Sequence, residues 1–118
     1  MGQKKYPFHR TITLAAVAGT NLLKDDQVGP LDLVCYQRVA VINETNPYTR
    51  LRLTIQRVGP TFLISEEANP RVDQLYWDDV AVYLTEGEIY TAELTGCSAS
   101  DVLKMYVTGW EQENGSLE

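Results

Sequence analysis

The feature that most constrains this chain is a period-two alternation of apolar and polar residues. In TRLRLTIQRV, residues 49–58, Leu51, Leu53 and Ile55 fall on one face, and polar residues fall on the other. Side chains of a strand point alternately to its two faces, so the pattern predicts a strand with one buried and one solvated face. Because no long apolar stripe at helical spacing occurs, we expect an all-β chain.

Similar patterns recur along the chain and are separated by turn residues. They predict strands at 10–17, 31–45, 61–66, 80–84, 89–94 and 101–110. Segment 31–45 is long for one straight strand, so we expect a bulge near Tyr36 to Arg38 and a turn at 43–47. We expect the last strand to bury Leu103, Met105 and Val107.

The remaining segments are polar and are expected to be loops. They are residues 18–30, where Leu22 and Leu23 would cap the core, and residues 66–74; a short helix is expected only near 98–102. About eight short strands predict an antiparallel β-sandwich, jelly-roll-like in form. Connectivity is invisible to periodicity, so an immunoglobulin-like sandwich stays open as an alternative.

The length of 118 residues suits one domain with its own core. We divide the chain into an N-terminal arm at 1–10, a sandwich at 11–112 and a tail at 113–118 that has the composition of a cloning scar. The arm lacks the apolar segment of a signal peptide, and no apolar run approaches the roughly 20 residues that span a bilayer. Cytosolic synthesis is therefore expected.

The net charge narrows the classes of binding partner, and the cysteine spacing bears on disulfide bonding. The 10 basic and 16 acidic residues give a net charge of −6, which disfavours nucleic acid and anionic membranes as partners. Cys35 and Cys97 show no C-x-x-C spacing, and buried free thiols are the favoured interpretation, with one disulfide between them as the alternative.

The stretch VAVYLTEGEIYTAEL, residues 80–94, carries three carboxylates that suggest an acid/base or metal site: Glu86, Glu88 and Glu93. A β-hairpin explains the stretch better, with Gly87 left-handed in a three-residue loop. Its register pairs Leu84 with Tyr90, Val82 with Ala92 and Val80 with Leu94, all facing the core. The carboxylates then lie in water, where nothing shifts their pKa toward catalysis.

No other constellation predicts catalysis, a metal or a cofactor. The acidic pairs lack the alternating pattern of a calcium loop, and His9 is the only histidine, so zinc would find at most three ligands with Cys35 and Cys97. Nucleophile-elbow, dinucleotide and Walker motifs are missing. We therefore expect a protein that is not an enzyme. Three aromatic residues are candidates for an interface or a glycan platform: Tyr76, Trp77 and Trp110.

Four motifs between residues 31 and 110 carry a resemblance to a known group of proteins. RVAVINET, RLRLTIQRVGPTFLI, LYWDDVAVYLTEGE and AELTGCSASDVLKMYVTGW resemble the small β-sandwich proteins of tailed bacteriophage virions, of the capsid-decoration or tail-accessory type. The resemblance implies a subunit without chemistry, often a homotrimer, that docks on the major capsid protein or another virion protein. It also implies assembly in the host cytoplasm.

The N-terminal arm has no counterpart in that group. Arms of this kind reach across to neighbouring subunits, so we expect the contact with the shell or a sister protomer to use Lys4, Lys5, Tyr6, Phe8 and Arg10. The alternative function is a glycan-binding module for host attachment. A structural subunit should bury Trp77 and Trp110 in the core or at an interface, whereas a glycan binder should expose them side by side.

Overall fold

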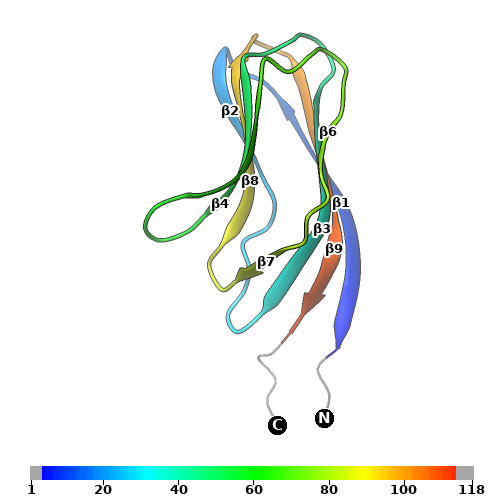
Figure 1. Cartoon of the computed structure of the whole chain (residues 1–118), viewed down its shortest axis with the longest axis vertical. Coiled ribbons are helices and arrows are strands. Elements are labelled where there is room, and N and C mark those ends of the chain that lie inside the picture. Colours follow the sequence, from blue (N-terminus) through cyan, green and yellow to red (C-terminus); the bar gives the residue numbers. More distant parts are fainter. Residues whose placement is uncertain (1–3, 114–118) are drawn as a thin grey trace.

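The computed structural model describes residues 4–113 and consists of two antiparallel β-sheets packed face to face (Figure 1). The strands are β1 (Lys5–Ala15), β2 (Gly19–Lys24), β3 (Leu33–Asn43), β4 (Arg50–Gln56), β5 (Phe62–Ala68), β6 (Tyr76–Asp78), β7 (Val82–Thr85), β8 (Ile89–Cys97) and β9 (Val102–Gln112). The predicted all-β sandwich is confirmed, with nine strands in place of about eight. Within residues 4–113 no helix is long and apolar enough to cross a membrane.

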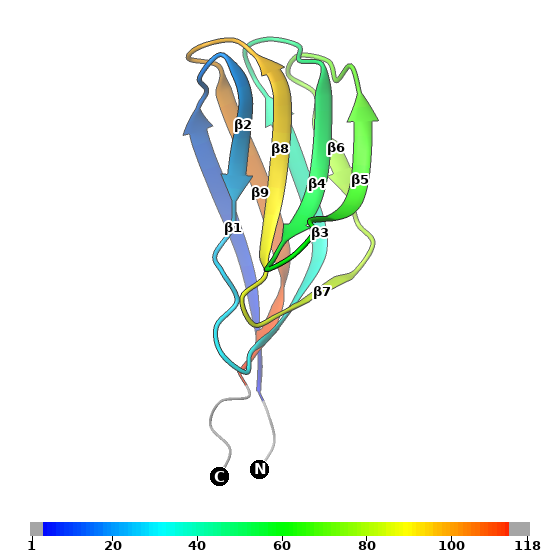
Figure 2. The ribbon, with the colours of Figure 1, turned by 90° about the vertical axis from the view of Figure 1, so that its left-hand side faces the viewer.

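The order of the strands identifies the winding of the sandwich. Sheet A has the order β1-β9-β3-β6, with β7 also paired to β3, and sheet B has the order β2-β8-β4-β5 (Figure 2). The first strand thus pairs with the last, the second with the second-to-last, and β4 with β5. This nested pairing is that of one long hairpin rolled up on itself, which is the jelly-roll form of the sandwich.

The core lies between the two sheets and uses the faces that the alternation predicted. Leu51 and Leu53 of β4 are 3% exposed, and Leu103 and Met105 of β9 are fully buried. Tyr90 of β8 also faces this core, as the predicted register required. Strands with one apolar face can bury it only against another such face, which is why two sheets form.

The predicted bulge and turn are both present in β3. The pairing of β3 with β9 shifts register between Tyr36 and Arg38. After β3 ends, the Asn43 side-chain oxygen accepts hydrogen bonds from the backbone N–H groups of Thr45 and Asn46, at 2.9 and 3.1 Å. Such a side-chain turn satisfies backbone donors that leave the sheet.

The predicted hairpin at 80–94 is wrong in its pairing. The turn at 86–88 exists and Gly87 is left-handed, with φ of 84°, but β7 pairs with β3 in sheet A whereas β8 pairs with β2 and β4 in sheet B. The turn therefore joins the two sheets. Val80, expected in the core, is 70% exposed. The alternation of apolar and polar residues predicts which face of a strand is buried, but it does not predict which strand is its neighbour in the sheet.

Two further local predictions are corrected. Part of the expected loop at 18–30 is strand β2, in which Leu23 is buried and Leu22 is not. The polar residues Asn21 and Asp25 point inward with Leu23, which hid the alternation. The short helix expected near 98–102 is a tight turn, closed by a hydrogen bond from the Asp101 N–H to the Ser98 carbonyl at 3.2 Å.

The boundary between arm and sandwich also differs from the prediction. β1 begins at Lys5 and pairs with β9 along its whole length, from Lys5 opposite Gln112 to Ala15 opposite Val102. Backbone hydrogen bonds to β9 thus make residues 5–10 part of sheet A, although their charge suggested a free arm. Residues 1–3 and the last five residues of the predicted tail lie outside the described residues.

Candidate interaction surfaces

The outer face of sheet A carries aromatic residues on two rungs of the sheet. On one rung Ala40 of β3 lies between Trp77 of β6 and Tyr106 of β9. On the other rung the small residue Cys35 takes the place of Ala40.

That second rung sets Cys35 between Tyr83 of β7 and Trp110 of β9, and the two rings meet edge to face at 6.2 Å. Cys35 is buried but lies outside the core cluster, as a residue covered from the outer side should. We call the set of Trp77, Tyr83, Tyr106 and Trp110 the aromatic face.

Basic side chains lie over two of these rings. The Arg38 guanidinium is 4.9 Å from the ring centre of Trp77, and the Lys5 ammonium is 4.4 Å from that of Trp110. Contacts of this kind are attractive because the ring face is electron-rich. Trp77 nevertheless remains 57% exposed and Tyr83 58% exposed, so these two rings of the aromatic face are open to solvent.

The structure separates the three aromatic residues singled out in the sequence. Trp77 and Trp110 share the aromatic face, but the rung of Arg38 and Thr108 lies between them. Tyr106 and Trp110 are about 13 Å apart along β9 at the usual rise per residue. Tyr76 points the other way, packs against the core, and accepts a hydrogen bond from the Arg71 N–H at 2.7 Å.

Two of the predicted arm residues turn into the sandwich. Phe8 meets the ring of Tyr36 edge to face at 5.6 Å. Arg10 donates two hydrogen bonds to the Asp25 carboxylate, from Nε at 2.9 Å and Nη2 at 2.6 Å. Phe8 and Arg10 are therefore not available as free arm residues, whereas Lys4, Lys5 and Tyr6 are exposed.

Asp25 is the carboxylate at the centre of a cluster with Arg10 and Tyr36. Its side chain is 2% exposed and also accepts a hydrogen bond from the Tyr36 hydroxyl at 2.5 Å. Burial on its own would raise the pKa of the Asp25 carboxyl, but the hydrogen bonds from Arg10 and Tyr36 outweigh it and hold that pKa below its ordinary value. The cluster ties β1 and β3 to the segment after β2.

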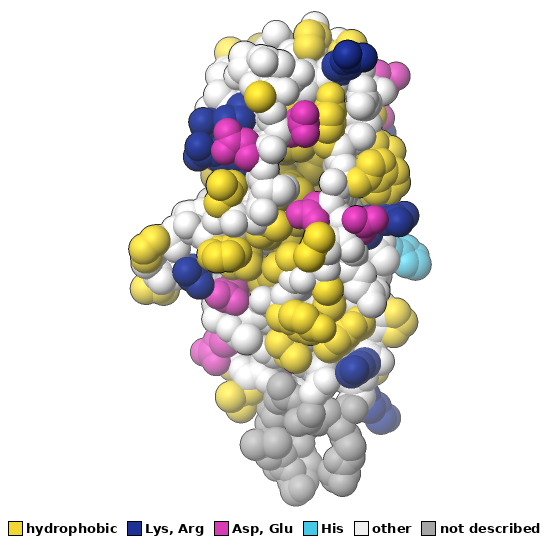
Figure 3. All heavy atoms as spheres, viewed as in Figure 1, with side chains coloured by type: hydrophobic (Ala, Val, Ile, Leu, Met, Phe, Trp, Pro, Cys, Tyr) yellow, Lys and Arg dark blue, Asp and Glu magenta, His cyan; other side chains and the backbone are white. Residues whose placement is uncertain are grey.

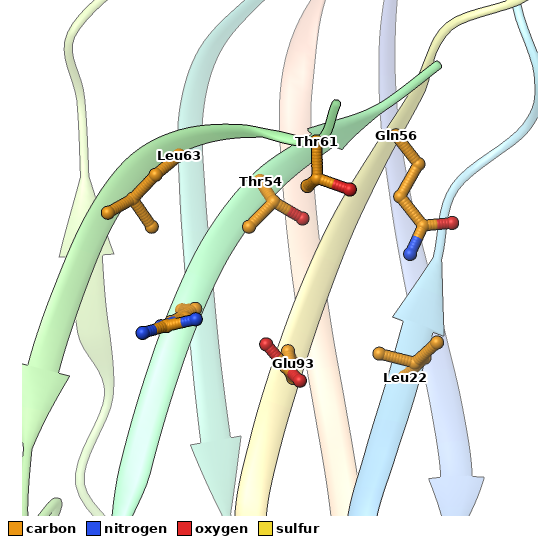
Figure 4. A pocket seen from close by; sticks show the side chains of 7 residues that line it. Leu22, Thr54, Gln56, Thr61, Leu63 and Glu93 are labelled. Atoms are coloured by element: carbon orange, nitrogen blue, oxygen red, sulfur yellow. The ribbon is translucent and has the colours of Figure 1, made fainter. Parts of the chain in front are cut away.

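A second surface, on the outer face of sheet B, is hollowed. The β4–β5 hairpin projects from the sandwich (Figure 1), and hydrophobic side chains are visible on it (Figure 3). Val58 in its loop is fully exposed, and Phe62 at the start of β5 is half exposed. At the base of this hairpin lies a groove of about 300 Å³ (Figure 4). We call it the sheet B groove; it is lined by Leu22, Arg52, Thr54, Gln56, Thr61, Leu63 and Glu93.

The three carboxylates at 86–93 do not form one site. Glu86 accepts a hydrogen bond from the Leu31 N–H at 3.3 Å, and Glu88 caps its own turn by accepting one from the Thr85 N–H at 2.7 Å. Glu93 lies away from both, in the sheet B groove. Within residues 4–113 no group of three or more His, Cys, Asp or Glu side chains is placed to hold a metal ion.

Both cysteines are free and buried. Cys35 lies under the aromatic face, and Cys97 lies in the core cluster between the sheets. Burial raises the pKa of each thiol, which lowers its thiolate fraction. The favoured interpretation of free thiols is confirmed.

Comparison with known proteins gives the fold and no family. No family model and no curated protein matches the chain. Among solved structures, the chain is similar to one from Bacillus endospore appendages, described as a novel family of disulfide-linked pili, with a TM-score of 0.57 and 11% identity over 98% of this chain and 93% of that one.

Other solved structures are more distant. PirA has a TM-score of 0.46 at 14% identity over 86% of this chain and 93% of that one. A carbohydrate-binding module, CBM4, has a TM-score of 0.37 at 11% identity over 87% of this chain and 82% of that one. The likeness to the appendage structure shows a shared sandwich fold. None of these three structures is a bacteriophage protein. A role in a bacteriophage virion is therefore a proposal.

Proposed function

We propose that this chain is a non-enzymatic structural subunit that assembles through its aromatic face. The observation that carries the proposal is the exposure of Trp77 and Tyr83 on one face of sheet A, together with the rings of Tyr106 and Trp110. Large exposed apolar patches on small domains mark protein contacts, and Trp, Tyr and Arg are the side chains that dominate such contacts.

The setting we propose is the virion of a tailed bacteriophage, where the chain would decorate or stabilise the capsid shell as a homotrimer. The sequence motifs and the jelly-roll sandwich support this setting. The shared fold with a protein of Bacillus endospore appendages is compatible with an assembly role in general. Because Cys35 and Cys97 are buried, we propose assembly through noncovalent contacts, without intermolecular disulfides.

The aromatic face suits a protein partner better than a glycan. Trp77 and Trp110 are separated by the rung of Arg38 and Thr108. Arg38 and Lys5 already occupy space over the two tryptophan rings. A sugar stacking on either ring would first have to displace a cation, whereas a protein surface can accept both ring and cation. Glycan binding at these residues therefore remains the weaker candidate.

The test is light scattering coupled to size-exclusion chromatography, over a range of concentrations. We expect a stable trimer for the wild-type chain and a monomer for the double variant Trp77→Ser, Tyr83→Ser. The matched control is Val58→Ser, which removes an exposed apolar side chain from the β4–β5 hairpin and should leave the trimer intact. A wild-type monomer at all concentrations, or a trimer that survives the double substitution, would overturn assembly through this face.

A further inference from the structure

We propose that the sheet B groove is a binding site for a neutral, hydroxyl-rich ligand, of the class of a monosaccharide or disaccharide. The site lies on the opposite sheet from the aromatic face and is independent of the assembly role proposed above. Its volume of about 300 Å³ is at the lower end of the range for small-molecule pockets, which runs from about 300 to 1,000 Å³. A ligand of one or two sugar rings suits that volume.

The groove gathers polar side chains that have no partner within residues 4–113. The Glu93 carboxylate, the Gln56 amide and the Thr61 hydroxyl make no hydrogen bond or ion pair there. Figure 4 shows the three side chains arranged around the same hollow, with the Gln56 amide directed toward the side of Leu22 and Glu93. Together they offer acceptors from a carboxylate, and both donors and acceptors from an amide and a hydroxyl.

The charge pattern around the groove selects against anions and, within the described part of the chain, gives a cation only one carboxylate without a partner, Glu93. Arg52 lies directly between Glu93 on β8 and Glu66 on β5 in the sheet register. The Arg52 Nε donates a hydrogen bond to the Glu66 carboxylate at 3.2 Å. The two carboxylates repel a free anion, and the guanidinium reduces the attraction of Glu93 for a free cation. A neutral ligand with many hydroxyls meets no charge repulsion and can donate to Glu93 while accepting from Arg52 or Gln56.

Two of the side chains that line the groove are apolar. Leu22 comes from β2, and Leu63 comes from β5 at the base of the projecting hairpin, so they lie at opposite sides of the hollow (Figure 4). A wholly apolar ligand would desolvate Glu93 and Gln56 without replacing their water hydrogen bonds, which costs free energy. A sugar has hydroxyls that can form hydrogen bonds with Glu93 and Gln56, and C–H groups that can pack against Leu22 and Leu63.

The experiment is a titration followed by amide proton–nitrogen correlation spectra of the full chain. The probes are glucose, galactose, mannose and N-acetylglucosamine, each raised to about 50 mM, which saturates a millimolar site. N-acetylneuraminic acid is added as an anionic probe. We expect saturable shifts for at least one neutral sugar at the amides of Gln56, Thr61, Leu63 and Glu93, and weaker binding of the anionic probe.

Variants connect the shifts to the groove. Glu93→Ala should weaken binding of that sugar about 10-fold or more, the loss expected for a hydrogen bond to a charged group. Asp79→Ala is the matched control, since it removes an exposed carboxylate on the other side of the molecule and should leave the affinity unchanged. Trp77→Ala should also have no effect, which separates this site from the aromatic face.

Four results would overturn the proposal. One is the lack of saturable shifts with every neutral sugar. The second is a set of shifts confined to the amides around Trp77 and Trp110, which would place sugar binding on the aromatic face. The third is an equal loss of affinity in Glu93→Ala and Asp79→Ala. The fourth is tighter binding of the anionic probe than of any neutral sugar. The spectra themselves report whether each variant is folded.

Discussion

At the scale of single residues, the sandwich is tied together by buried carboxylates as well as by apolar packing. The Asp25 carboxylate accepts hydrogen bonds from the guanidinium of Arg10 and the hydroxyl of Tyr36. The Asp101 carboxylate, which is 1% exposed, accepts hydrogen bonds from the side-chain amides of Asn43 and Asn46 at 2.9 and 2.6 Å. Each carboxylate joins segments that are distant in the sequence: Asp25 ties the segment after β2 to strands β1 and β3, and Asp101 ties the turn before β9 to the end of β3 and the turn that follows it.

The substitution Asp25→Asn should destabilise the fold by about 3 kcal/mol, because it leaves the Arg10 guanidinium without its anion. The measurement is urea denaturation at neutral pH. The matched control is Asp26→Asn, which changes an exposed neighbour and should alter the free energy of unfolding by less than about 0.5 kcal/mol. Equal effects of the two substitutions would show that the buried ion pair contributes nothing specific.

The thiols give a second prediction at this scale. Cys35 and Cys97 are 2% and 5% exposed, and burial raises the pKa of both. A thiol reagent such as 5,5′-dithiobis(2-nitrobenzoate) should therefore leave both thiols unmodified in the native protein and react with both after denaturation. Rapid reaction of either thiol in the native state would contradict their placement, and a dimer on a non-reducing gel would contradict noncovalent assembly.

At the scale of elements, the bulge in β3 depends on a glycine in the neighbouring strand. Gly109 of β9 lies opposite Tyr36, where the register shifts. A Cβ atom at Gly109 would collide with the backbone carbonyl of Cys35. The close approach of the two strands is possible because this position has no side chain.

Gly109→Ala should therefore cost about 2 to 3 kcal/mol of stability, the range for overpacking at a site that cannot relax. Thermal or chemical unfolding measures the loss. Gly59→Ala is the comparison, since a Cβ there meets open space and only the positive φ of 100° opposes it, at a cost of about 1 kcal/mol. If Gly109→Ala were the milder of the two, the contact with Cys35 would not limit the packing of β3 and β9.

At the scale of the whole molecule, stability should depend on pH in one direction. The pKa values of Asp25 and Asp101 are lower in the folded chain than their ordinary values, because hydrogen bonds to the charged form outweigh burial. As the pH falls, these carboxyl groups are therefore protonated at a higher pH in the unfolded state, where their pKa is about 3.9, than in the folded state. Their contribution is complete above that pH and is lost as the pH falls through the folded-state values.

The midpoint of urea unfolding should accordingly stay level from pH 7 to about 5 and then fall steeply below about pH 4. Asp25→Asn should show a shallower fall, because one of the two groups is missing. A fall of the same steepness in both proteins would show that other carboxylates control acid unfolding.

The sequence by itself determined which residues form most of the strands and which face of each strand is buried. Leu51, Leu103 and Tyr90 are in the core because period-two alternation is a local property of the chain. The bulge near Tyr36 and the left-handed Gly87 were also predicted, since bulge and turn chemistry are local too.

The tertiary structure decided the pairing of strands and the content of both surfaces. β7 and β8 lie in different sheets although three residues join them, because burial of their apolar faces was possible against more than one neighbour. Polar residues that point inward concealed β2: Asn21 is satisfied locally by Val17, whereas Asp25 has its partners on two other strands, Arg10 of β1 and Tyr36 of β3. The aromatic face and the sheet B groove each combine residues of three or more strands, so the periodicity of any one strand could not predict which residues would meet there.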